Sequence, residues 1–324
     1  MRKPSPEGAL VHRICSKFDV FRTSGVRLGT GDDAALWQPR QGYETILTSD
    51  WFLEGSHFLR AKHPPNSVGW KCLARATSDI AAMGGAPRCF LLNLALPQSQ
   101  TGKWLDGFLV GLKRASNHLQ CAMVGGDTTK SDRILICMTV IGEVRCGQAI
   151  PRSEARPGEL LYVSGRLGEA ELGLRLLKAA KGVTQRQKKE LQKHLYPEPR
   201  IALGQWLAEH RLATSMMDLS DGLSLDLASL CEASRVGAQI EEASLPIPFG
   251  VRQQLGVQLA LHGGDDYELL FAVTEQNAGK LPSSFNGLPI TCIGRTTKTK
   301  RVLARRPNGR NTTLIPGGWD PFRK

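Results

Sequence analysis

Short apolar runs alternate with helical patterns along most of this 324-residue chain. In the first half we expect an opening helix behind Ser5-Pro6, strands over residues 45–49, 89–96, 122–124 and 134–141, and helices over 68–83 and 100–119. In the second half we expect strands over 160–164, 216–218, 268–273 and 289–293, and helices over 168–180, 185–193, 201–210 and 222–235. This alternation indicates an α/β or α+β protein. No unit of about 20–50 residues recurs, which excludes a solenoid.

The length of the chain suggests two domains, because single domains usually have about 100–200 residues. The composition shifts toward glycine, proline, arginine and serine over residues 146–158. We therefore expect an N-terminal α/β domain over residues 1–148 and a C-terminal α/β domain over residues 149–324.

The chain is basic, with 42 Lys and Arg against 30 Asp and Glu and a net charge of +12. Such a charge favours a polyanionic partner such as nucleic acid. The basic residues are scattered, however, with local clusters only at residues 186–189 and 298–306, and no aromatic-rich basic stripe accompanies them. Nucleic acid is therefore not the expected partner.

The eight cysteines include no C-x-x-C pair and no grouping with histidine at zinc-ligand spacing, so we expect reduced thiols. The longest apolar run, residues 89–97, is about half the length of a bilayer-spanning helix. The first nine residues are polar and contain proline, unlike a secretory signal. We expect a cytoplasmic protein with no membrane partner.

Many carboxylates lie beside glycines or at the expected ends of apolar segments. They are Asp32 and Asp33, Asp50, Asp127, and the pair Asp218 and Asp221. Glycine lets a ligand approach the backbone closely, and strand ends project side chains into crevices, so both are frequent in functional sites. Each loop alone also fits a structural role, because Asp before Gly is common in turns and Asp often caps a helix.

Asp79 lies inside an expected helix of small residues, where an uncompensated carboxylate would be costly. Two alternatives could compensate this charge. The first is an ion pair with Arg75, four residues earlier on the same helix face. The second is a bound cation. The candidate ligands in these acidic segments have many oxygen-bearing side chains, little His and no Cys, and such a set favours Mg²⁺ over Zn²⁺.

Three common motifs are absent from the chain. It has no G-x-x-x-x-G-K-[ST] phosphate loop, no complete dinucleotide-binding fingerprint at Gly29-x-Gly31 and no G-x-S-x-G nucleophile elbow. Phosphate chemistry, if present, must depend on metal ions and Gly-Asp segments.

Seven motifs in order carry a resemblance to a known family. They are Gly31-Asp32-Asp33-Ala34-Ala35, Thr48-Ser49-Asp50, Gly55-x-His57-Phe58, Ser78-Asp79-Ile80-Ala81-Ala82-Met83-Gly84, Gly125-Gly126-Asp127-Thr128-Thr129, Asp218-Leu219-Ser220-Asp221-Gly222-Leu223 and Gly263-Gly264-Asp265-Asp266-Tyr267-Glu268-Leu269. The chain resembles the thiamine-monophosphate kinase family, in the superfamily that includes aminoimidazole ribonucleotide synthetase. It departs from the usual pattern at Thr48-Ser49, where Ser-Thr is usual, and at Arg75-Ala76-Thr77, which replaces a Val-Asn-Leu type of segment.

The resemblance implies a two-domain fold. The N-terminal α/β domain would contribute strands to a dimeric barrel, and ATP would bind in the cleft between it and the C-terminal α/β domain. The implied reaction is Mg²⁺-dependent transfer of the ATP γ-phosphoryl group to thiamine monophosphate, giving thiamine diphosphate and ADP. A homodimer and several Mg²⁺ ions are implied as well.

The resemblance also implies roles for individual residues. The Mg²⁺ ligands would be Asp33, Thr48, Ser49, Asp50, Asp79, Asp127, Asp218 and Asp221; the ATP contacts Gly126, Asp127, Arg152 and Ser220; and the thiamine-phosphate contacts His57, Asp265 and Trp319. No protein nucleophile is expected. Three of these residues also fit other roles: Arg152 as a solvated loop residue, His57 as a packing residue, and Trp319 as a cap on the core.

Elementary electrostatics agrees with these expectations. The acceptor is a phosphate oxygen, already anionic near neutral pH, so no protein base is needed. Two polyanions repel each other, so the reaction needs dense positive charge, which Mg²⁺ ions held by carboxylates can supply. Acidic segments in a basic protein are then expected.

Two other readings stay open from the sequence. One is another ATP-dependent synthetase of the same superfamily, with a shared ATP site but different substrate loops. The other is a non-catalytic metal-binding or nucleic-acid-binding protein, which would explain the charge but not the ordered motifs.

Overall fold

The computed structural model describes residues 5–18, 25–179, 187–254 and 256–323. The chain divides into two compact units. The first contains Met1–Ile80 and Ala86–Cys146, and the second contains Ala81–Gly85 and Gly147–Lys324. The short segment Ala81–Gly85 belongs to the second unit because its backbone packs against the helix Ile201–Glu209, where an added Cβ on Gly204 would lie 2.1 Å from the Ala81 oxygen.

The first unit is built on a four-stranded sheet in the order β3-β6-β4-β5. Its strands are β3 (Tyr43–Leu53), β4 (Ala86–Leu96), β5 (Ala122–Lys130) and β6 (Leu135–Arg145), with a separate small pair of β1 (Val26–Leu28) and β2 (Leu36–Trp37). Only β4 and β5 are parallel, and the helix between them makes the crossover that a parallel pair requires.

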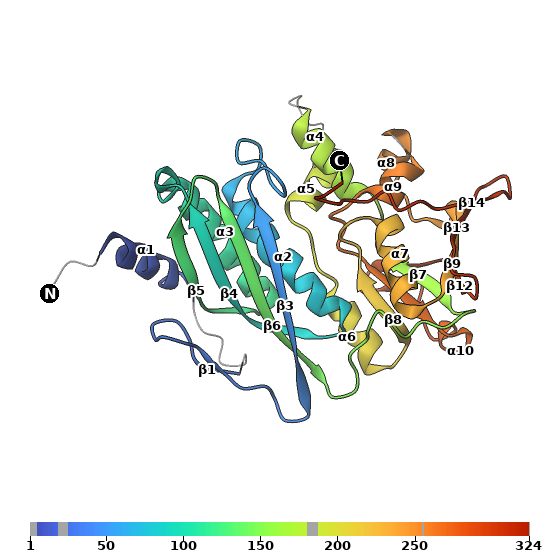
Figure 1. Ribbon diagram of the computed structural model, residues 1–324, viewed down its shortest axis with the longest axis horizontal. Coiled ribbons are helices and arrows are strands. Elements are labelled where there is room, and N and C mark those ends of the chain that lie inside the picture. The colour runs from blue at the N-terminus through green and yellow to red at the C-terminus, as the bar shows by residue number, and fades with distance from the viewer. Residues whose placement is uncertain (1–4, 19–24, 180–186, 255, 324) are drawn as a thin grey trace. The chain divides into compact units, whose positions relative to one another are not determined.

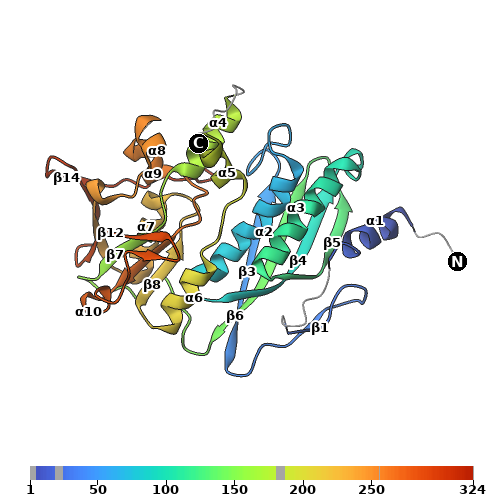
Figure 2. The ribbon, with the colours of Figure 1, turned by 180° about the vertical axis from the view of Figure 1, so that it is seen from behind.

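Two long helices, α2 (Pro65–Ala82) and α3 (Lys103–Leu119), cover one face of this sheet, as Figures 1 and 2 show from opposite sides. They cross closely because glycines stand at the contact: a Cβ on Gly111 would lie 1.8 Å from the Asn66 oxygen. The helix α1 (Pro6–Cys15) begins at Ser5, whose side chain accepts a hydrogen bond from the Gly8 amide, and lies beside β5. The short 3₁₀ helix η2 (Gln98–Gln100) precedes α3.

Two expected strand ends in this unit are wrong. Asp50 does not end its strand, because β3 continues to Leu53 and pairs with β6 along its whole length. The expected strand 122–124 likewise runs on through Gly125, Gly126 and Asp127 to Lys130. The register shifts between Phe90 and Leu91, which leaves Val124 as a bulge directly before the two glycines. Both sets of acidic residues therefore project from within strands.

The second unit contains a larger mixed sheet in the order β14-β13-β9-β12-β7-β10-β8, with β11 paired to β12. Its strands are β7 (Leu160–Ser164), β8 (Ala213–Asp218), β9 (Gly237–Glu241), β10 (Leu269–Val273), β11 (Ser284–Phe285), β12 (Leu288–Thr297), β13 (Val302–Arg305) and β14 (Asn311–Thr313). Its helices are α4 (Glu169–Lys178), α5 (Gln187–Leu195), α6 (Ile201–Glu209), α7 (Leu223–Ser234), α8 (Phe249–Gln254), α9 (Val257–His262) and α10 (Glu275–Ala278), with the 3₁₀ helix η3 (Glu242–Ser244). Part of the expected helix 185–193 lies outside the described residues.

The central strand β10 is buried at all five positions, because helices pack on both faces of the sheet. Leu270 and Ala272 join a core with α7 and α9, whereas Leu269, Phe271 and Val273 join a core with α6. A strand buried on both faces has a continuous apolar sequence, as here. The expected α/β architecture is confirmed in each unit. In the described part of the chain, no helix is long and apolar enough to cross a membrane.

Candidate active site

Thr48 and Asp50 lie on the face of β3 that packs against α2. The Thr48 hydroxyl donates a hydrogen bond to the Asp79 carboxylate on α2. Both oxygens of Asp50 accept from Arg75, whose Nε and Nη2 each lie 3.2 Å from a different oxygen. The structure therefore brings three expected metal ligands together on one face: Thr48, Asp50 and Asp79.

The ion pair that the sequence suggested between Arg75 and Asp79 is not the one that the structure shows. Arg75 lies one helical turn before Asp79 on α2, and its side chain crosses to β3 instead. Its guanidinium carbon lies 5.2 Å from the centroid of the Phe52 ring. A planar guanidinium can hold a carboxylate through two parallel hydrogen bonds, which an exposed pair along a helix rarely achieves.

Ser49 lies on the opposite face of the sheet from Thr48 and Asp50, because successive strand residues alternate in direction. Its hydroxyl lies 3.2 Å from the Thr139 hydroxyl and 3.4 Å from Cys137 Sγ on β6. The structure does not bring the Ser49 hydroxyl together with those two expected ligands.

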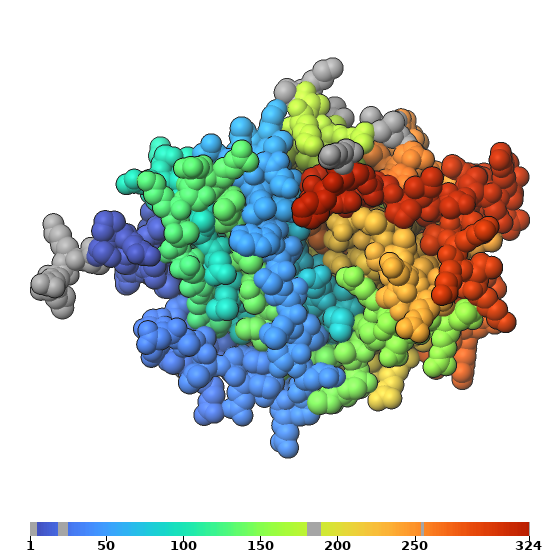
Figure 3. All heavy atoms as spheres, viewed as in Figure 1, coloured from blue at the N-terminus to red at the C-terminus, as the bar shows by residue number. Residues whose placement is uncertain are grey.

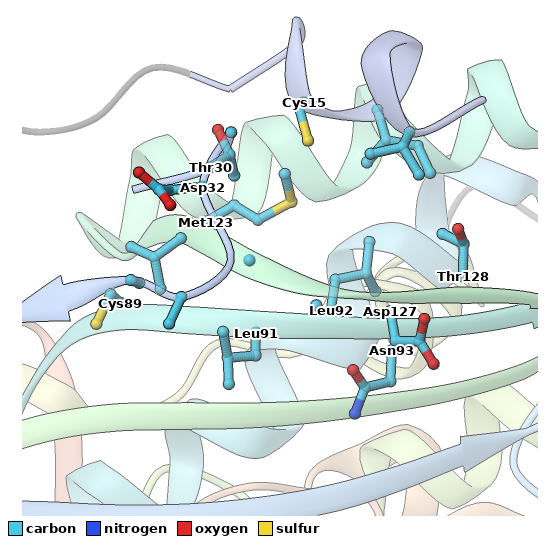
Figure 4. Close-up of a pocket in the computed structure, with 18 of the residues that line it drawn as sticks. Cys15, Thr30, Asp32, Cys89, Leu91, Leu92, Asn93, Met123, Asp127 and Thr128 are labelled. Carbon is cyan, nitrogen blue, oxygen red and sulfur yellow. The ribbon is translucent and has the colours of Figure 1, made fainter. Parts of the chain in front are cut away.

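Asp33, Gly126 and Asp127 line one pocket of the first unit, with a volume of about 630 Å³. Figure 4 shows Asp127 beside Asn93, from the neighbouring strands β5 and β4, with Thr30 and Asp32 on a separate segment at the upper left of the view. Asp127 pairs in register with Asn93, which pairs with Cys137, so Asp127 lies on the face opposite α2. The expected ligands of the first unit thus form two groups on opposite faces of one sheet.

His57 follows β3 in a turn that Gly55 allows with a φ of 87°. The chain folds back so that the Leu53 amide donates to His57 Nδ1 at 3.0 Å. Because Nδ1 accepts this hydrogen bond, the proton of the neutral ring lies on Nε2. The imidazole is therefore oriented as a donor through Nε2.

Asp218 ends β8 in the second unit and is buried, and Asp221 follows in the turn before α7. Asp226, in the first turns of α7, accepts hydrogen bonds from the Asp221 amide at 3.2 Å and the Gly222 amide at 3.0 Å. Burial, followed by the charges of Asp218 and Asp221, raises the pKa of Asp226 well above its ordinary value. Three carboxylates thus gather at the N-terminus of α7.

Asp265 lies next to this turn, because its amide donates to the Ser220 oxygen at 2.8 Å. Its side chain accepts a hydrogen bond from the Tyr267 hydroxyl at 2.7 Å. Asp265 and Tyr267 both have positive φ angles, 68° and 49°. Such backbone is uncommon for these residue types and persists where surrounding contacts hold it.

Trp319 is held beside Asp221, whose carbonyl oxygen accepts from the Trp319 amide at 2.8 Å. The preceding Gly317 amide donates to the Ser224 hydroxyl at 3.0 Å, and that hydroxyl lies 2.7 Å from His262 Nδ1. The Trp319 side chain is 47% exposed, so it does not cap the core.

Arg152 is placed beside β8 through its backbone. Its carbonyl oxygen accepts from the hydroxyls of Ser215 at 2.7 Å and Ser234 at 2.6 Å, while the residue as a whole is exposed. An exposed side chain on a fixed backbone fits both a phosphate contact and a solvated loop residue.

A buried ionic network centred on Glu268 lies next to Asp265 in the sequence. Glu268 accepts from Ser164, Lys193 and Arg200, at 2.6 Å, 2.6 Å and 2.5 Å respectively. Burial opposes its ionisation, but the charges of Lys193 and Arg200 outweigh burial and lower the pKa of Glu268. The neighbouring Asp266 accepts from the Gly168 and Ala170 amides at the start of α4.

The ionisation of Asp266 leads to a pH prediction. Burial raises its pKa from 3.8 to about 7. The folded protein therefore holds a proton that the unfolded chain has already lost above pH 4, so this group's contribution to the free energy of unfolding falls as pH rises from about 4 to 7. Asp266→Asn keeps an acceptor for both amides but cannot ionise. The free energy of unfolding of this variant, minus that of the native chain, should increase by about 1 kcal/mol or more from pH 5 to pH 8. Denaturant unfolding at several pH values measures this difference. A difference that stays constant with pH would contradict this assignment.

The donor chemistry of these acidic groups fits Mg²⁺, because hard oxygen atoms are the ligands it prefers. Among the described residues, no three His, Cys, Asp or Glu side chains are arranged to hold a metal ion. Mg²⁺ is usually bound through one or two carboxylates together with substrate phosphates. Pairs of carboxylates such as those seen here therefore suit an ion that arrives with a nucleotide.

Sequence reasoning missed two residues that the structure places in the acidic groups. Asp226 lies four residues after Gly222, a spacing at which a helical side chain reaches back to the amides that precede the helix. For Arg75 the sequence suggests only a partner on its own helix. Strand alternation along β3, which puts Thr48 and Asp50 on one face and Ser49 on the other, was a further signal available from the sequence.

Two family models match the chain. "AIR synthase related protein, N-terminal domain" matches residues 31–144, and "AIR synthase related protein, C-terminal domain" matches residues 156–305. The thiamine-monophosphate kinase of Escherichia coli strain K12 is 37% identical over 319 residues, which cover 95% of this chain and 97% of that protein.

Solved structures agree with the sequence comparisons. The crystal structure of thiamine-monophosphate kinase from Stenotrophomonas maltophilia K279a has a TM-score of 0.81 and 35% identity, covering 92% of this chain and 96% of that one. A structure described as AaThiL complexed with AMPPCP and TMP has a TM-score of 0.79 and 32% identity, covering 90% and 91%.

Proposed function

This chain belongs to the thiamine-monophosphate kinase family of AIR synthase related proteins, and we propose that it transfers the γ-phosphoryl group of ATP to thiamine monophosphate, giving thiamine diphosphate and ADP. The observation that carries the proposal is the 37% identity to an E. coli kinase over nearly the whole of both chains. The complex of a 32% identical relative with AMPPCP and TMP supports ATP and thiamine monophosphate as the two substrates.

The chemistry requires binding and orientation more than a protein base. The acceptor phosphate oxygen is already anionic near neutral pH, so the chain must hold two polyanions in line against their repulsion. Bound Mg²⁺ would supply positive charge to the transferring phosphoryl group. The groups in the first unit that we propose as ligands are Thr48 and Asp50 on one face of the sheet with Asp79 on the helix α2 that covers it, and Asp33 and Asp127 in the pocket on the other face.

Further proposed contacts come from residues of each unit. Asp218 and Asp221 are proposed Mg²⁺ ligands at the start of α7. The proposed ATP contacts are Gly126 and Asp127 in the first unit, and Ser220 and Arg152 in the second. His57, Asp265 and Trp319 are the proposed contacts to thiamine monophosphate. The half-exposed Trp319 ring can stack on a cationic thiazolium, and the hydrogen-bonded Asp265 can accept from an amine.

The reaction is tested by incubating the purified protein with Mg²⁺ and ATP together with either thiamine monophosphate or free thiamine. We expect thiamine diphosphate from thiamine monophosphate, and no phosphorylation of free thiamine. Product only from free thiamine, or from neither compound, would exclude the proposed reaction.

We also propose that the first unit forms a homodimer through the face of its sheet that α2 and α3 leave open. On β3, Leu47 is 69% exposed and Trp51 is 56% exposed on this face, and Figure 3 shows β3 at the surface from that side. Large apolar side chains exposed on the open face of a sheet are characteristic of an interface. We also propose that the reaction takes place in the cytoplasm. All eight cysteines are free thiols in the structure, and both reduced thiols and ATP are typical of that compartment.

The dimer leads to a prediction about Trp51. Light scattering should give twice the chain mass for the native protein, and Trp51→Glu should give a monomer because a charge on this face cannot be desolvated cheaply. Val110→Glu, at another exposed apolar position on α3, should stay dimeric. A native monomer at high micromolar concentration would exclude the dimer but not the kinase activity.

A further inference from the structure

The group formed by Thr48 and Asp50 on β3 and Asp79 on α2 already contains a cation of the chain itself. Arg75 contacts both oxygens of Asp50 at 3.2 Å, and the side chains of the pair are only 13% and 29% exposed. A pair with this geometry and burial is stronger than an ordinary surface ion pair. Asp50 therefore has its charge compensated without any bound metal.

The position of Arg75 is set from more than one side. Its guanidinium lies over the Phe52 ring, which is 1% exposed and stacks on Phe58 with 5.1 Å between ring centroids. Its backbone belongs to α2, the helix that also carries Asp79. An arginine held by a helix, a ring and a carboxylate keeps its place at low entropic cost.

From this geometry we propose that Arg75 competes with Mg²⁺ for Asp50. The inference rests on the proposed role of Asp50 as a Mg²⁺ ligand. The guanidinium occupies one lone pair on each Asp50 oxygen and its positive charge repels a second cation at that carboxylate, so the ion pair weakens Mg²⁺ binding while it stabilises the metal-free site. The chain would then need more Mg²⁺ to fill this position than the same site without Arg75.

Calorimetric titration of Mg²⁺ into protein saturated with AMPPCP tests the proposal without turnover. Arg75→Leu should lower the half-saturating Mg²⁺ concentration about three- to tenfold, because the competing pair is removed. Arg75→Lys keeps the charge but loses the paired donors. Its half-saturating Mg²⁺ concentration should lie between those of Arg75→Leu and the native chain. If Arg75→Leu does not fold, Arg75→Gln, which also removes the charge, replaces it with the same expected direction.

Two further variants separate the possible failures. Arg88→Leu is the matched control, because Arg88 pairs with Glu143 at 2.9 Å in the same unit and Glu143 keeps Arg40; its Mg²⁺ midpoint should equal that of the native chain. Asp50→Asn should weaken Mg²⁺ binding strongly. If it does and Arg75→Leu leaves the midpoint unchanged or raises it, competition is excluded while Asp50 remains a ligand. If Asp50→Asn changes nothing, the competition fails together with the metal role of Asp50.

Discussion

Replacing Asp218 with asparagine is expected to lower the rate of phosphoryl transfer by about a hundredfold or more. The substitution removes a charge and nearly preserves size, and each electrostatic element of such a site contributes several kcal/mol to the transition state. Asp50→Asn and Asp79→Asn should have effects of the same order. Steady-state kinetics at saturating ATP and thiamine monophosphate would measure the loss.

The fold of these variants should survive. Burial raises the pKa of Asp226 most, and the charges of Asp218 and Asp221 raise it further. Because these carboxylates repel one another without metal, Asp218→Asn should raise the melting temperature of the ligand-free protein. The added stabilisation by Mg²⁺-ATP should shrink at the same time. The control is Asp106→Asn, at an exposed carboxylate paired with Arg13, which should change neither quantity. If the three aspartates served only as helix caps or turn residues, asparagine would replace them with little loss of activity.

Gly126→Ala is expected to destabilise the first unit by about 2 kcal/mol or more. Gly126 has a φ of 144°, and an added Cβ would lie 1.8 Å from the Leu92 carbonyl oxygen on β4. That oxygen belongs to backbone in the centre of the sheet and cannot move aside. Asp127 follows directly, so the lining of the pocket should be lost as well.

The neighbouring glycine provides a matched control. At Gly125 a Cβ would meet only the Leu91 side chain, with its nearest atom at 3.1 Å, and that side chain can rotate. Gly125→Ala should therefore cost less than about 1 kcal/mol. Denaturant unfolding of both variants measures the difference. Equal stability of the two would show that the glycines are not required by the close approach of β5 to β4.

The longer helices and several apolar strands were predictable from the sequence because a single face or a single run determines them, whereas α8, α9, α10 and β9 were not among the expected elements. The strand 160–164 was placed correctly at both ends, and the helix 68–83 differs from α2 by a few residues, since its apolar face and the following Gly84-Gly85 mark it. The apolar run of β10 was visible because both faces of that strand are buried.

The lengths of β3 and β5 were not predictable in the same way. Asp50, Gly125 and Gly126 resemble strand ends when considered alone, and only the pairing with β6 and β4 carries the strands past them. The membership of Ala81–Gly85 in the second unit depends on contacts with α6, more than a hundred residues later in the chain. Such contacts leave no local pattern in the sequence.

The candidate site was predictable as a set of residues but not as a geometry. The aspartates were recognised from their glycine neighbours and motifs, whereas the division of the first unit's ligands between two faces of the sheet follows from strand register. The partner of Arg75 depends on which β3 side chain faces α2. Both the division of the ligands and the partner of Arg75 depend on contacts between different secondary-structure elements.

The most direct test of the proposed activity follows the transferred phosphoryl group itself. ATP labelled with ³²P at the γ-position is incubated with the protein, Mg²⁺ and thiamine monophosphate, and the products are separated by chromatography. Direct transfer predicts that the label moves into the terminal phosphate of thiamine diphosphate in a one-to-one ratio with the ADP formed. Label released as inorganic phosphate, without labelled thiamine diphosphate, would contradict the assignment of this chain as a kinase for thiamine monophosphate.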